Sequence, residues 1–73
     1  MHQPVDYEET RFYGGIAQTA VDLIDLGNLA LRQGDVRLAR QGYEESLVIW
    51  QALDDEPGMT YARGRLELLE EGK

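Results

Sequence analysis

Apolar residues recur at intervals of three and four over residues 16–33, which places them on one face of an α-helix. That face consists of Ile16, Ala20, Leu23, Ile24, Leu26, Ala30 and Leu31. The same spacing continues in residues 36–53, with Val36, Ala39, Tyr43, Leu47 and Trp50. A third series, in residues 58–71, contains Met59, Tyr61, Ala62, Leu66, Leu68 and Leu69. No segment alternates with a period of two for long enough to indicate a strand, so the pattern predicts an all-α chain of three helices.

Two short turns are predicted between these helices. Gly34-Asp35 combines a glycine that ends one helix with an aspartate that caps the next. Residues 54–58 place carboxylates and Pro57 where a third helix would start. Such short connections require antiparallel neighbours. Residues 1–15 are acidic and aromatic and end in a Gly-Gly pair, so we expect an irregular N-terminal arm before a single domain over residues 16–73.

The composition narrows the range of functions. The 73 residues contain seven Lys and Arg against 14 Asp and Glu, which gives a net charge of −7, and they contain no cysteine and one histidine, His2. Disulfides and thiolate metal sites are excluded, and the sequence predicts neither catalytic residues nor a metal or cofactor. The acidic charge opposes nucleic-acid binding, and the longest apolar run, residues 47–50, is too short to span a membrane. We therefore expect a cytoplasmic protein that is not an enzyme.

An internal similarity links the third helix to the first. A shift of 38 residues superposes Leu31 on Leu69 and Gly34 on Gly72, and also Leu23 on Tyr61 and Ile24 on Ala62. A period in the upper thirties that contains two antiparallel helices is typical of helical repeat proteins.

The residues at the first turn of this pattern resemble the tetratricopeptide repeat. They read Leu23-x-x-Leu26-Gly27-x-x-Ala30 and then Ala39-x-x-x-Tyr43, and the wording is most similar to divergent repeats in bacterial signalling ATPases and transcriptional regulators. The resemblance implies an α-solenoid fragment. Gly27 and Ala39 are the small residues where two antiparallel helices would cross closely. The third helix departs from the pattern, with Arg65 where the repeat has glycine.

The same resemblance implies a binding surface on the first helix of each repeat. Carried onto this sequence, the partner-binding residues are Ile24, Asn28, Leu31 and Arg32 in the first helix, and Ala62, Arg63, Leu66 and Glu70 in the third. Asn28 and Arg32 are four residues apart, so their polar ends can converge on a backbone amide or a carboxylate of a peptide or protein partner. The alternative is that Ile24 and Leu31 belong to the core and that Arg63 pairs with Glu67.

Two other functions fit the sequence. The third helix carries more apolar residues than one neighbour can cover, which favours a homodimeric scaffold element; Trp50 would then be either a core residue or an interface anchor. The acidic surface could also imitate nucleic acid and inhibit a basic partner. Asp22 and Asp25 share a helical side, but a solvated face explains them more simply than a reacting pair.

Overall fold

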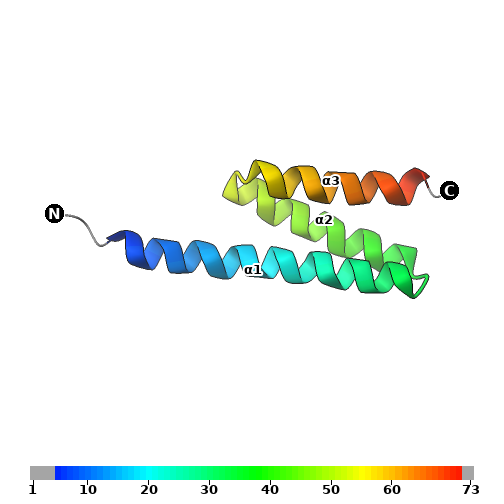
Figure 1. Ribbon diagram of the computed structural model, residues 1–73, viewed down its shortest axis with the longest axis horizontal. Coiled ribbons are helices and arrows are strands. Elements are labelled where there is room, and N and C mark those ends of the chain that lie inside the picture. Colours follow the sequence, from blue (N-terminus) through cyan, green and yellow to red (C-terminus); the bar gives the residue numbers. More distant parts are fainter. Residues whose placement is uncertain (1–4, 72–73) are drawn as a thin grey trace.

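The computed structural model describes residues 5–71, with side chains from residue 14 onward. Within this range the chain forms three α-helices and no strand: α1 (Val5–Arg32), α2 (Val36–Leu53) and α3 (Glu56–Glu71). The helices form one elongated layer of 55 × 19 × 13 Å in which α2 lies between the other two (Figure 1). α1 and α3 run in the same direction, and each packs on α2 and hardly on the other. The all-α prediction is confirmed.

The turn between α1 and α2 has the predicted chemistry. Gly34 has a positive φ of 85°, and its N–H donates to the Leu31 carbonyl at 3.0 Å. The Asp35 N–H donates to the Ala30 carbonyl at 2.9 Å, so two carbonyls at the end of α1 are satisfied. The Asp35 carboxylate in turn accepts from the Leu38 N–H at 3.1 Å and caps α2.

The turn between α2 and α3 repeats this arrangement without glycine. Asp54 takes the left-handed conformation, with φ 57°, and its N–H donates to the Gln51 carbonyl at 3.1 Å. Aspartate is among the few residues that tolerate this conformation. The Asp55 carboxylate accepts from the Gly58 N–H at 2.9 Å, so α3 is capped there and begins at Glu56, two residues before the predicted start.

The prediction of an irregular arm over residues 1–15 was wrong for residues 5–15, which are the first turns of α1. Extending an existing helix avoids the cost of nucleation, and the two glycines at 14 and 15 each cost only about 1 kcal/mol relative to alanine. Thr19 also donates its hydroxyl to the Gly15 carbonyl at 3.2 Å. This end of α1 extends beyond α2 and α3 (Figure 1). Residues 1–4, with His2, and residues 72–73 lie outside the described part of the chain.

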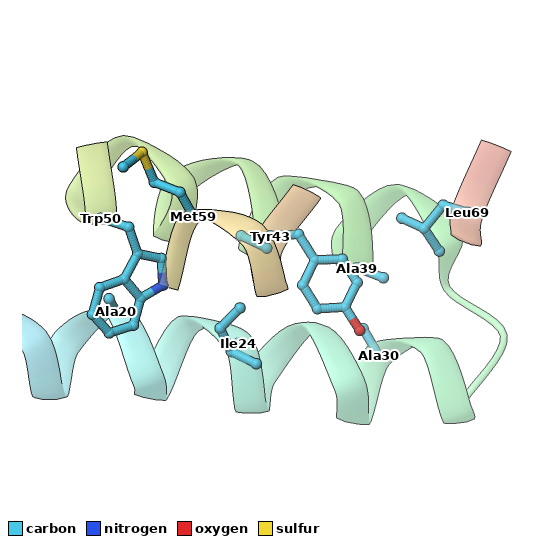
Figure 2. Packing of buried hydrophobic residues seen from close by; sticks show 9 residues of the cluster. Ala20, Ile24, Ala30, Ala39, Tyr43, Trp50, Met59 and Leu69 are labelled. Carbon is cyan, nitrogen blue, oxygen red and sulfur yellow. The ribbon is translucent and has the colours of Figure 1, made fainter. Parts of the chain in front are cut away.

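The core lies along α2 and receives side chains from all three helices (Figure 2). Its buried apolar residues are Ala20, Ile24, Ala30, Ala39, Tyr43, Trp50, Met59, Ala62 and Leu69. Several residues predicted on the apolar faces are instead exposed. Leu26 is 45% exposed because it lies about 100° around α1 from Gly27, which faces α2, and Val36 is exposed at the first turn of α2.

α1 and α2 approach closely, as predicted, but through a different pair of residues. A Cβ at Gly42 would lie 2.9 Å from the Leu23 carbonyl oxygen and 3.3 Å from the Gly27 Cα. The crossing is therefore glycine against glycine, and Ala39 is a fully buried neighbour one turn earlier. The sequence carried a signal for this, because Ala39, Gly42 and Ser46 follow at intervals of three and four, and all three are buried.

Each crossing also has an aromatic ring from α2 seated against a glycine. A Cβ at Gly27 would lie 2.7 Å from Tyr43 Cε1, and a Cβ at Gly58 would overlap the Trp50 indole. Figure 2 shows both rings reaching from α2 towards α1. The aromatic rings thus fill the space between α1 and α3, and Trp50 is a core residue.

Candidate functional site

A polar bridge joins the three helices at Tyr43. The tyrosine is fully buried, and its hydroxyl donates a hydrogen bond to Asn28 Oδ1 in α1. Arg65 in α3 donates to the same hydroxyl oxygen from Nε and from Nη2, both at 3.4 Å. A buried tyrosine needs a partner for its hydroxyl, so the close seating of its ring on Gly27 fixes where Asn28 and Arg65 meet.

Arg65 is a half-buried cation without an anionic partner. Its Cζ lies 5.6 Å from the centre of the Tyr43 ring, within the range of a cation–π contact. The hydrogen bond to Tyr43 raises the pKa of the Arg65 guanidinium above its ordinary value. Among the residues that the structure describes, no carboxylate forms an ion pair with it, although the chain carries a net charge of −7. The long distances to Tyr43 leave most of its N–H groups available for a stronger acceptor.

Asn28 supplies a second set of donors beside Arg65. Its Oδ1 accepts from Tyr43, which directs the amide N–H₂ group away from the tyrosine. Within the described part of the chain, this N–H₂ group donates no hydrogen bond, and the residue is half-buried. Two groups of donors therefore flank one phenol oxygen. An acceptor with two oxygens, such as a carboxylate, matches that arrangement chemically.

Comparison with known proteins gives no relative. No protein-family model, curated protein or solved structure matches this chain. The family resemblance therefore stays a prediction, and the site is interpreted from its own geometry.

The predicted binding residues separate into three groups in the structure. Ile24 and Ala62 are buried in the core and are not accessible to a partner, which corrects their assignment. Leu31 and Leu66 are half-buried against the core. The remaining polar residues are exposed or half-exposed: Asn28, Arg32, Arg63 and Glu70. The alternative reading, in which the apolar members belong to the core, is the correct one for Ile24.

Arg63 lies on the wrong side of α3 for the predicted site. Residues two apart on a helix point to opposite sides, so Arg63 faces away from Arg65 and its contact with Tyr43. Sequence reasoning missed Arg65 because it was noted only as a departure from the glycine of the repeat. Its position was itself a signal, because the shift of 38 residues places Arg65 on Gly27, the residue beneath Tyr43.

Other chemistry in the described part of the chain is limited. Asp22 and Asp25 are both exposed, and Asp22 accepts from the Gln18 amide at 3.0 Å, as expected for a solvated helix face. Residues 5–71 contain no cluster of three or more His, Asp or Glu side chains arranged to hold a metal ion. None of the three helices described combines the length and apolar character needed to cross a bilayer.

Proposed function

We propose that the chain is a non-catalytic protein–protein interaction module that binds a peptide or protein segment at Asn28 and Arg65. The convergence of these two residues on Tyr43 is the observation that carries the proposal. They come from α1 and α3, the two helices that α2 separates, so a ligand bound to both would bridge the outer helices. A cysteine-free chain suits a reducing cytoplasm, where we expect the module to act.

We further propose that the helices form a tetratricopeptide-like repeat followed by the first helix of a second one. The antiparallel pair α1 and α2, its close crossing at Gly27 and Gly42, and the parallel direction of α1 and α3 support this assignment. In the family that the sequence resembles, the first helices of successive repeats line the binding surface. α1 and α3 would hold those places, with Asn28 and Arg65 on them.

The ligand group that we assign to this site is a carboxylate. Its two oxygens would accept from the Arg65 guanidinium and from the Asn28 amide, replacing weak contacts at 3.4 Å with charge-assisted hydrogen bonds. Arg32, one turn after Asn28 and exposed, adds a second cation on the same side of α1. Binding would therefore weaken as salt is raised.

Selection from a library of displayed short peptides on the immobilised chain tests this function. Selected peptides are then measured by fluorescence anisotropy against Arg65→Met, which keeps the aliphatic stem but removes the donors, and against Asn28→Ala. We expect affinity to fall about 10-fold or more for each variant, which is ~1.4 kcal/mol or more of binding free energy.

Arg63→Met is the matched control, because this arginine lies on the same helix but on the opposite side. It should leave the affinity within a factor of about two, a small fraction of 1.4 kcal/mol. Failure to enrich any peptide, or equal binding of the selected peptides to all three variants, would contradict the proposed site. Helical content measured by circular dichroism has to be unchanged for the comparison to count.

A further inference from the structure

α3 contains a glycine that its packing within the chain does not explain. Gly27, Gly42 and Gly58 each lie where a Cβ would overlap or crowd a neighbouring helix. Gly64 is also inside a helix, but in the described part of the chain nothing lies within 4 Å of its Cβ position. Glycine is the least favourable helix residue apart from proline, and at the other three positions a close approach compensates for it.

Gly64 lies in the middle of an exposed apolar row. Pro57, Tyr61, Gly64 and Leu68 follow at intervals of four, three and four, so they lie along one side of α3. Tyr61 is 49% exposed and Leu68 is 51% exposed. Gly64 is two residues from the buried Ala62, which places this row, the α3 seam, on the side away from the core. α3 forms one edge of the layer, so this side of the helix is open (Figure 1).

We propose that the α3 seam binds a second copy of the chain, with the two α3 helices antiparallel and crossing at Gly64. A two-fold axis at this point would place Tyr61 of each copy opposite Leu68 of the other. A large side chain and a glycine-centred crossing then meet, as they do at Gly27 and Gly58 within the chain. The seam is thus complementary to itself.

Charge favours a second copy at this surface. The chain carries −7, so two copies repel each other unless they meet where carboxylates are absent. None of the four seam residues is acidic, and Arg65 borders the seam. Salt should therefore strengthen the dimer by screening the overall repulsion, whereas salt weakens a ligand held through Arg65. This opposite dependence separates the dimer from the proposed function, on which the dimer does not depend.

The size of the seam sets the expected strength. A single helix row is at the low end of specific interfaces, so the dimer should dissociate in the micromolar range. Sedimentation velocity of the full chain, from about 5 to 500 µM, spans that range. The expected mass rises from 8.3 kDa towards twice that value. A single species of 8.3 kDa at all concentrations would overturn the proposal.

Two pairs of variants distinguish the seam from general stickiness. Gly64→Gln adds a good helix former where the monomer has open space, so it should preserve or raise helical content while weakening the dimer about 10-fold or more. Gly14→Gln is its control, because Gly14 is also exposed and lies on α1. Leu68→Glu should likewise weaken the dimer, and Val48→Glu, on α2 and 63% exposed, should not. Dimerisation that survives both Gly64→Gln and Leu68→Glu would overturn the proposal.

Discussion

At the crossing of α1 and α2 the Tyr43 ring lies against Gly27, and at the crossing of α2 and α3 the Trp50 indole lies against Gly58. The two crossings differ in their polar ends. The Tyr43 hydroxyl is bonded on both sides, by Asn28 and Arg65, whereas the buried Trp50 Nε1 has no hydrogen-bond partner in the described part of the chain. An unsatisfied buried donor costs about 1–3 kcal/mol.

The backbones also meet differently at the two crossings. Gly42 brings α2 against the backbone of α1 itself, while Gly58 meets only the side chain of Trp50 among its nearest neighbours. α2 accordingly packs more extensively on α1 than on α3. The comparison indicates a tightly joined α1/α2 pair, to which α3 is attached by one indole and by the Tyr43–Arg65 contact. A partner that binds Asn28 and Arg65 would strengthen the weaker attachment.

Removing the rings should have the largest effect. Tyr43→Ala deletes a fully buried ring and leaves two polar side chains without a partner, so we expect a loss of about 3–5 kcal/mol in the free energy of unfolding. Trp50→Ala also removes the unsatisfied donor and should cost roughly 1–3 kcal/mol less than Tyr43→Ala. Urea unfolding followed by circular dichroism measures both. An equal or larger loss for Trp50→Ala would contradict the difference drawn between the crossings.

Adding one methyl group at Gly42 should come next. The Cβ of Gly42→Ala would meet the Leu23 carbonyl, which cannot rotate away as a side chain can, and overpacking of this kind costs about 1–3 kcal/mol. The better helix propensity of alanine returns about 1 kcal/mol, so we expect a net loss of about 1–2 kcal/mol.

Gly64→Ala is the matched control for that change. Its Cβ meets nothing within the chain, so in dilute solution, where the chain is monomeric, it should stabilise by about 1 kcal/mol through helix propensity alone. The two substitutions are thus expected to have opposite signs. Stabilisation by Gly42→Ala would show that the helices do not cross at this residue.

Removing only the polar ends should have the smallest effect. Tyr43→Phe leaves Asn28 and Arg65 without the shared oxygen and should cost about 1–2 kcal/mol. In Trp50→Phe, the loss of one ring is offset by the loss of the unsatisfied N–H, so the change should be under about 1 kcal/mol. Urea midpoints for these two variants give the comparison, and the reverse order of cost would mean that the Tyr43 bridge contributes nothing.

The local chemistry of the chain was sufficient to predict its turns and the middle of each helix. Gly34 and Asp35 end one helix and start the next through groups only a few residues away, so no knowledge of the fold is needed. The start of α1 was predicted wrongly, because two glycines weaken a helix without ending one that is already formed.

The site was less accessible to sequence reasoning than the helices. Asn28 was identified from its place in the repeat pattern, but Arg65 acquires its role only when α2 brings Tyr43 between α1 and α3. Gly42 was missed for a similar reason, since the residue that it meets is a backbone carbonyl of another helix. Contacts between helices, rather than periodicity within one, determine both.

The distance between Gly27 and the Tyr43 ring tests the central claim most directly. Nuclear Overhauser effects in the unmodified chain report it without perturbing the packing. We predict strong effects between the Gly27 Hα protons and the Tyr43 ring protons, and none between Gly64 Hα and any ring of the same chain. If Gly27 showed no more contact with Tyr43 than Gly64 does, the crossing would not exist, and Asn28 and Arg65 would have no reason to meet.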